Sequence, residues 1–430
     1  MEAETVSNQK HEKLPGLWVA TFVCLPACFF FLYEFVLQVS PNVMTSELMR
    51  DLHVDAAGIG FISGAYYIAY TGMQIPAGLL YDRFGPRILL AIASFICAAG
   101  AFAFALTEGV LAASSGRFLM GAGSTFAFIG CLVLVSRWFP AKYFAVLAGV
   151  VQLMSSAGAI MGEAPLAAAV ETYGWREIMT IIGFAGLVLA AVVFLIVRDS
   201  PDRTVHGMHK SHRGELARFL YVLRIPQTWT VALYSFTSWA PILVFAALWG
   251  VPFLQAVYGI SATAAASAVS MVWISIGIGS PLAGWISDAI GRRVFPLFAC
   301  SALGLVASSV IVFVPNIPFS MMFLLLFLFG LAASAQSLSF ALVKDNNKAS
   351  MVGTAIGINN TMVVCGGILF QPLVGLILRF GWDGKIQDNI PVYLVSDYRT
   401  ALAIIPACFL LGVIVSAFFL RESYCKPIAH

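Results

Sequence analysis

Long, unbroken apolar runs are the feature that most constrains this chain. Each run holds about 20 or more mostly apolar residues, which is the length that an α-helix needs to cross a bilayer. Twelve spanning helices are predicted, at residues 17–40, 56–80, 88–107, 111–137, 143–168, 176–197, 228–257, 262–287, 294–314, 318–343, 350–379 and 399–421. Backbone groups in lipid must be hydrogen-bonded within the protein, and the runs lack the apolar–polar alternation of a barrel strand. The sequence therefore predicts an all-α membrane protein.

The surface of such a chain must face lipid. Only 10% of its 430 residues are charged, whereas a soluble domain carries about 25%. The lipid bilayer is therefore an expected partner, and nucleic acid is not. The eight cysteines are scattered without metal-ligand spacing, so no metal and no bound cofactor are expected. We also find no Ser/His, Glu/His or metal constellation that would indicate an intramembrane enzyme.

The basic residues predict the orientation of the helices. If the N-terminus is cytoplasmic, eighteen of the 24 lysine and arginine residues lie on the inner side and five on the outer side, as the positive-inside rule requires. Both termini are then cytoplasmic, and a bacterial inner (plasma) membrane is expected. The predicted regions are a tail at 1–16, a bundle at 17–197, a linker at 198–227, a second bundle at 228–421 and a tail at 422–430.

Two loops repeat one pattern at a constant offset. The first reads Gly78-Leu-Leu-Tyr-Asp82-Arg83-Phe-Gly85-Pro-Arg87, and the second reads Gly284-Trp-Ile-Ser-Asp288-Ala-Ile-Gly291-Arg292-Arg293. Both glycine pairs, the aspartates and the final arginines are each separated by 206 residues. Such repeats mark transporters, and here they indicate two related six-helix halves.

These loops resemble the major facilitator superfamily pattern G-x-x-x-D-[RK]-x-G-[RK]-[RK]. Pro86 replaces one basic residue in the first loop and Ala289 replaces one in the second. The resemblance covers essentially the whole chain. It implies two pseudo-symmetric six-helix bundles around a central cavity, which work by alternating access.

The repeated loops are predicted to form a conformational latch. By family resemblance, Asp82 should sit at the N-terminus of the eleventh helix near Ser350, and Asp288 at that of the fifth helix near Lys142. A helix N-terminus favours negative charge. Arg83 and Arg87 would hold the inner gate by ion pairs. The latch would stabilise the outward-open state; alternatively, the loop arginines only fix topology.

Three ionisable residues fall inside predicted spans: Glu34, Arg117 and Glu163. Such residues are costly in lipid and usually face a cavity or a partner. All three fall in the outer half of the bilayer, so one bundle could bring two carboxylates near one guanidinium. Residues 117–123 also resemble the superfamily's fourth-helix motif, whose arginine is often linked to proton or substrate coupling. The alternative is a buried structural ion cluster.

Polar and aromatic residues supply further candidates for substrate or proton coupling. These are Gln38, Gln152, Asn359, Asn360, Tyr67 and Trp239. The amides could instead join helices, and the aromatic residues could be packing.

The resulting expectation is a secondary active importer of a small amphoteric solute, such as an amino acid or small peptide, driven by a proton gradient. Residues 33–44 also resemble the first helix of the bacterial intraphagosomal amino-acid transporter branch. A monomer is expected. The alternatives are an exporter of drug-like or siderophore-like compounds and a non-transporting membrane sensor.

Overall fold

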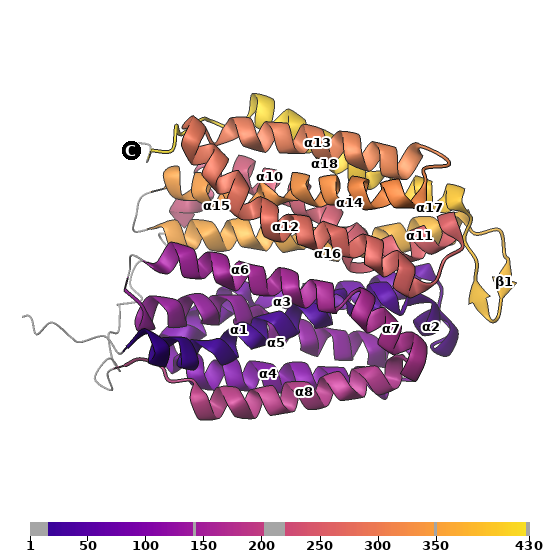
Figure 1. Ribbon diagram of the computed structural model, residues 1–430, viewed down its shortest axis with the longest axis horizontal. Coiled ribbons are helices and arrows are strands. Elements are labelled where there is room, and N and C mark those ends of the chain that lie inside the picture. Colours follow the sequence, from indigo (N-terminus) through magenta and orange to yellow (C-terminus); the bar gives the residue numbers. More distant parts are fainter. Residues whose placement is uncertain (1–15, 141–142, 202–219, 348–350, 427–430) are drawn as a thin grey trace, which may run out of the picture.

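The computed structural model describes residues 16–140, 143–201, 220–347 and 351–426, and nearly all of them are helical. The helices run roughly side by side in two halves, drawn in purple and in orange to yellow in Figure 1. We call these the N half, up to residue 201, and the C half, from residue 220. The predicted all-α membrane fold with two six-helix bundles is confirmed.

The described part of the N half contains nine helical elements. These are α1 (Leu17–Val39), η1 (Ser40–Val43), α2 (Thr45–Asp51), α3 (Ala56–Phe84), α4 (Pro86–Ala105), α5 (Val110–Trp138), α6 (Phe144–Met161), α7 (Ala164–Tyr173) and α8 (Trp175–Ile196).

The C half has the same plan and adds a small hairpin. Its elements are α10 (Pro226–Val244), η4 (Phe245–Trp249), α11 (Gly250–Tyr258), α12 (Ala262–Ile290), α13 (Val294–Phe313), α14 (Phe319–Ser334), α15 (Gln336–Asp345), α16 (Val352–Gly381), β1 (Ile386–Gln387), β2 (Ile390–Pro391), α17 (Val395–Leu402) and α18 (Ile404–Phe418). The antiparallel pair β1–β2 lies in the loop after α16.

Eleven helical segments of the described chain are long and apolar enough to cross a membrane. The twelfth long helix is α3, with 29 residues. Four predicted spans are interrupted. The span predicted at 143–168 is two helices, α6 and α7, because Pro165 starts a new helix after Gly162 and Glu163. The span at 228–257 contains a wider π-helical turn, η4, and those at 318–343 and 399–421 each divide in two.

The two ends of the bundle differ, and we name them by their residues. The terminal face carries Gly85, Gly291 and the described end of the chain at Lys426; it lies at the left of Figure 1. The hairpin face carries α2 and β1–β2, at the right.

Close packing, an ion pair and a hydrogen bond join the N half to the C half at the hairpin face. Helix α3 packs along α16, and an added methyl at Gly60 would lie 2.6 Å from the Gln371 carbonyl oxygen. Arg379 forms an ion pair of 3.1 Å with Asp55 across the same seam. The Ala56 amide donates to the Tyr393 hydroxyl at 2.9 Å.

Toward the terminal face the same helices separate. A methyl group added at Gly72 or Gly78 of α3, or at Gly353 or Gly357 of α16, would meet nothing within 4 Å. Gly149 of α6 and Gly284 of α12, which belong to the second seam between the halves, also face open space. The structure is therefore closed at the hairpin face and parted at the terminal face.

Candidate functional site

Arg117 lies in the middle of the N half and is fully buried. Its Nη1 donates to the Leu37 carbonyl at 2.6 Å and its Nη2 donates to the Gln38 carbonyl at 3.4 Å. Its Nε has no hydrogen-bond partner. Within the described chain, no carboxylate lies within ion-pair distance of this guanidinium. A buried charge without a counter-ion is costly. The site therefore lacks a negative charge that would balance Arg117.

The local sequence explains why carbonyl groups of α1 are free to accept from Arg117. Pro41 has no N–H, so the Leu37 carbonyl four residues earlier loses its usual helical donor. Ser40 Oγ and Arg117 Nη1 donate to that oxygen instead. The end of α1 therefore forms the cradle for the guanidinium.

Tyr66 of α3 connects Arg117 with Glu34. Its hydroxyl donates to Glu34 Oε1 at 2.8 Å, and the centre of its ring lies 4.7 Å from the Arg117 guanidinium carbon. A cation over an aromatic face is attracted by the ring quadrupole. Gly121 of α5 makes this arrangement possible, because any side chain there would collide with the Tyr66 backbone.

Among the described residues, several buried polar atoms of α1, α3 and α16 have no hydrogen-bond partner. They are Glu34 Oε2, Gln38 Oε1, Ser63 Oγ, Tyr67 OH and Gln371 Oε1. Tyr67 lies close to the Gln38 and Gln371 side chains and within electrostatic range of Arg117 and Glu34. Its ring also packs on α16 at Gly367. Because buried polar groups are normally hydrogen-bonded, this cluster of free donors and acceptors suits a polar ligand that contacts both halves.

Glu163 does not join this cluster. Its oxygens accept from Asn42 Nδ2 at 3.1 and 3.2 Å and from Trp273 Nε1 at 3.4 Å. The expectation that two carboxylates approach one guanidinium is therefore wrong, because the break after α6 directs Glu163 toward η1 and the C half.

The other predicted residues lie apart from Arg117. Asn359 accepts from Ser235 and donates to Ser339, so its side chain joins α16 to α10 and α15 within the C half. Gln152 donates to Ser155 Oγ, three residues along α6. Asn360 and Trp239 are half-buried.

Asn42, Tyr66 and Gln371 are prominent in the structure but were not among the predicted site residues. Asn42 falls just outside the predicted first span, where a polar residue attracts no attention. The pattern Ser40-Pro41 is the only local signal that its surroundings have an irregular backbone.

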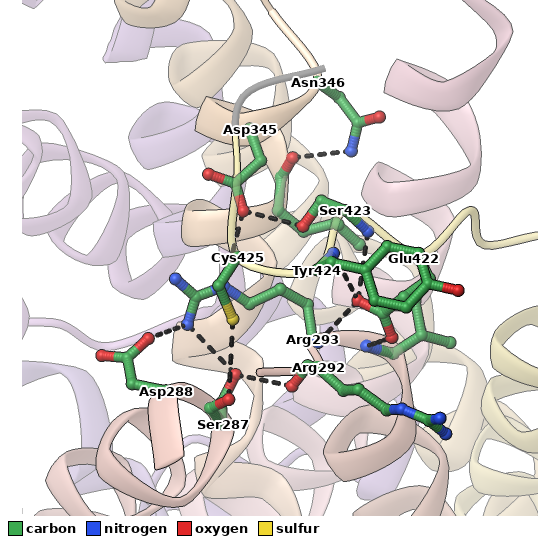
Figure 2. Close-up of polar contacts among 12 residues, drawn as sticks. Ser287, Asp288, Arg292, Arg293, Asp345, Asn346, Glu422, Ser423, Tyr424 and Cys425 are labelled. Carbon is green, nitrogen blue, oxygen red and sulfur yellow. Dashed lines mark hydrogen bonds and ion pairs between the residues drawn. The ribbon is translucent and has the colours of Figure 1, made fainter. Parts of the chain in front are cut away.

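The second repeated loop is tied within its own half (Figure 2). Arg293 Nη1 donates to Asp288 Oδ1 at 2.6 Å, and its Nε lies 3.4 Å from Asp345 Oδ2. Burial, the largest single influence, works to lower the pKa of Arg293, but the hydrogen bond to Asp288 and the nearby charges, including Asp288 and Asp345, together raise that pKa above the ordinary value. Glu422 accepts from the Arg293 and Val294 amides at 2.7 and 2.9 Å and so caps α13.

The first repeated loop has a matching arrangement. Asp199 Oδ1, just after α8, accepts from the Arg87 amide at 2.9 Å and so caps α4. The positive φ of Gly85 (74°) allows the close turn between α3 and α4. The Asp82 side chain and the expected latch positions at Lys142 and Ser350 lie outside the described residues. The latch therefore stays a prediction for the opposite state, in which the terminal face closes.

The family of the chain follows from its match to known proteins. The model for the Major Facilitator Superfamily matches residues 27–370 and again residues 244–426. The chain belongs to this superfamily. It is therefore a membrane transporter of small molecules and not an enzyme.

Several superfamily relatives are similar over much of this chain. The probable galactarate/D-glucarate transporter GudP of Escherichia coli (strain K12) is 23% identical over 428 residues, covering 90% of this chain and 91% of the relative. The hexuronate transporter of Bacillus subtilis (strain 168) is 23% identical over 256 residues, covering 59% and 60%. The narrower resemblance to the intraphagosomal amino-acid transporter branch finds no support in these matches.

Solved structures share the fold. A bacterial homolog of the human lysosomal transporter Spinster, in an inward-facing and unoccupied conformation, matches with a TM-score of 0.72 and 16% identity, covering 96% of this chain and 97% of that one. The nucleoside transporter NupG matches with a TM-score of 0.73 and 14% identity, covering 93% and 100%.

Proposed function

We propose that this transporter is a proton-coupled importer of a small solute that carries a carboxylate. Arg117 binds that carboxylate, and Glu34 carries the coupled proton. The observation that carries the proposal is the buried Arg117 guanidinium, which has a free Nε and no carboxylate partner among the described residues. A solute carboxylate would supply the missing counter-ion and accept charge-assisted hydrogen bonds.

Glu34 is suited to the proton because its two oxygens differ. Oε1 accepts from Tyr66, while Oε2 is buried without a partner. Tyr66 also lies against Arg117. A change of charge on Glu34 would therefore alter the position of the Tyr66 ring and, with it, the Arg117 guanidinium that binds the solute. Binding of an anion at Arg117 and of a proton at Glu34 would then favour one another.

The direction of transport follows from the proposed orientation. The distribution of basic residues supports a cytoplasmic terminal face, and the closed hairpin face would then be external. The structure would then be the state that releases solute inward. Under an inward proton gradient, this arrangement gives import. The repeated-loop latch, with Gly78, Asp82, Arg83 and Gly284, would close the cytoplasmic side in the alternate state.

Sugar acids suit the site best within the class of carboxylate solutes. Tyr67 OH, Gln38 Oε1 and Gln371 Oε1 are free neutral groups that could bind sugar hydroxyls. The names of the galactarate/D-glucarate and hexuronate relatives point in the same direction. The amphoteric solute is the second candidate. Its ammonium would bind the free Glu34 Oε2, which is the observation that favours it.

Uptake into proteoliposomes tests the proposal. Labelled glucuronate, galactarate, a pool of amino acids and, as an uncharged solute, glucose would be offered with and without an inward proton gradient. We expect gradient-driven uptake of a carboxylate solute by the unchanged protein. Arg117→Lys should lower uptake by about 30-fold or more, because an ammonium cannot make the two parallel hydrogen bonds of a guanidinium, and a disrupted buried charge pair costs about 2 kcal/mol or more. Glu34→Gln should leave solute exchange intact but remove its dependence on the gradient.

The matched control is Arg50→Lys, since Arg50 lies on the hairpin face and pairs with the adjacent Asp51. Its uptake should equal that of the unchanged protein. Full uptake by a monodisperse Arg117→Lys variant would remove Arg117 from the solute site. Uptake of uncharged solutes alone would overturn the carboxylate assignment.

A further inference from the structure

The side-chain amide of Asn42 is inserted into the backbone of a helix in the other half. Asn42 Nδ2 donates to the Ala246 carbonyl at 3.1 Å, and Asn42 Oδ1 accepts from the Val251 amide at 3.0 Å. These two backbone groups are five residues apart, the spacing of one π-helical hydrogen bond. They belong to η4 and the start of α11. Asn42 therefore takes the place of one backbone hydrogen bond and joins the N half to the C half.

The same amide also holds Glu163. Asn42 Nδ2 lies 3.1 and 3.2 Å from the two Glu163 oxygens. Trp273 of α12, in the C half, donates to Glu163 Oε1 at 3.4 Å. Asn42, Glu163 and Trp273 are all buried. One hydrogen-bonded unit, which we call the Asn42 clamp, therefore contains η1, the α6–α7 break, η4–α11 and α12.

In the part of the chain that the structure describes, no positive charge balances Glu163. Asn42 from η1 and Trp273 from α12 are the side chains bonded to it. Among the described residues, no lysine, arginine or histidine of any neighbouring element lies within ion-pair distance of it. A carboxylate buried without a cation normally takes up a proton rather than remain ionised.

We propose that the Asn42 clamp is a proton-dependent gate at the hairpin face. When this face is open, water reaches Glu163 and the carboxylate is ionised. A proton from the water on that side then neutralises Glu163, and the neutral side chain can be buried as Asn42 enters η4. Loss of the proton favours the hydrated, open arrangement.

The backbone of the C half makes the clamp reversible. When Asn42 withdraws, the Val251 amide and the Ala246 carbonyl regain each other as partners across the same five-residue spacing. The helix is therefore hydrogen-bonded in both states, and the titrating group is Glu163. An aspartate in place of Asn42 could not serve, since it would lack the N–H that reaches Ala246 and would place a second carboxylate beside Glu163.

Distance measurement across the hairpin face tests the gate without any solute. Spin labels would be placed at Leu106 of the N half and Phe380 of the C half, which are exposed. Introducing them as unnatural amino acids leaves the eight cysteines in place. Pulsed electron paramagnetic resonance in lipid nanodiscs, between pH 5.5 and 8.5, then gives the ratio of closed to open hairpin face.

For the unchanged protein we expect the closed population to grow as the pH falls, by at most about tenfold per pH unit for a single proton. Glu163→Gln should remain closed at every pH. Asn42→Ala should shift toward the open state at every pH. The matched control Asn359→Ala, which removes an amide bonded within the C half alone, should respond to pH as the unchanged protein does.

Two results would overturn the gate: a wild-type pH response in Glu163→Gln, or an unchanged closed population in Asn42→Ala. If Asn42→Ala does not give monodisperse protein, Glu163→Gln decides alone. A pH response lost in Glu34→Gln but kept in Glu163→Gln would place the sensor at Glu34 instead. The measurement involves no solute, so failure of the carboxylate assignment and failure of the gate are separate outcomes.

Discussion

The hairpin face and the terminal face differ in which helices their described polar contacts join. At the hairpin face, contacts cross between the halves: close packing at Gly60, the amide of Asn42 and the ion pair of Arg379 with Asp55. At the terminal face, the described polar contacts stay within one half: Asp199 accepts from the Arg87 amide, and Glu422 accepts from the Arg293 amide.

This difference separates two tasks that a transporter must perform. Contacts across the halves decide which face is open, whereas contacts within a half keep each bundle rigid during the change. Alternating access needs the first kind to break easily and the second kind to persist. Changes at the two faces should therefore alter different measured quantities.

The largest effect is expected from Gly60→Ala, which adds a methyl group where α3 and α16 are in close contact. In Gly60→Ala the new methyl would lie 2.6 Å from the Gln371 carbonyl oxygen and 2.8 Å from Pro372 Cα. Overpacking of this kind costs about 1–3 kcal/mol. The closed-to-open ratio of the hairpin face should fall by about 5- to 150-fold, as measured by the Leu106–Phe380 label distance.

Gly72→Ala in the same helix is the matched control for Gly60→Ala, because a methyl at Gly72 meets nothing within 4 Å. Its hairpin-face distance should not change. Equal shifts in both variants would mean that α3 responds to glycine replacement as such, and the contrast between the two faces would lose its basis.

The sequence was sufficient to predict the helices, the two halves and the superfamily. Length and hydrophobicity determine where a chain can span a bilayer, and the loops at Gly78 and Gly284 repeat at a constant offset. The position of Arg117 inside a span also follows from the apolar run around it, but the lack of a carboxylate partner among the described residues was not predicted. Such features depend on local composition, which a single sequence displays directly.

Partners across the fold could not be predicted in the same way. Glu163 was expected near Arg117, but the break after α6 and the bend at Pro41 direct it to Asn42 and the C half. The positions of these side chains depend on the backbone angles at the helix breaks. The contacts themselves join residues more than 100 positions apart in the sequence. No periodicity in the sequence encodes them.

A smaller effect is expected at the terminal face from Glu422→Gln. The Glu422 carboxylate caps α13 through two amides at 2.7 and 2.9 Å. Loss of the charged cap should destabilise the protein by about 1 kcal/mol, seen as a lower thermal unfolding midpoint in detergent. Asp199→Asn should act similarly through α4. Neither variant should change the hairpin-face distance, and a change there would show that caps within one half also control the gate.

The smallest effect is expected for Asp51, which tests whether position on the hairpin face matters without a bond across the halves. Asp51 lies at the hairpin face, but it accepts from Trp175 Nε1 at 2.8 Å and pairs with Arg50, all within the N half. Burial works to raise the pKa of Asp51, but the hydrogen bonds from Trp175 and Arg50 outweigh it and hold that pKa below its usual value. A lowered pKa stabilises the fold above the unfolded value of about 3.9, and this is lost as the pH falls through the folded value.

Asp51→Asn should therefore lower the unfolding midpoint slightly at pH 6. The free energy of unfolding should fall by well under about 1 kcal/mol, because solvent screens the group. The difference from the unchanged protein should vanish as the pH falls below about 3.9. The label distance should not change at any pH. If Asp51→Asn opened the hairpin face, position on that face rather than a bond across the halves would control the gate, and the distinction between the two kinds of contact would fail.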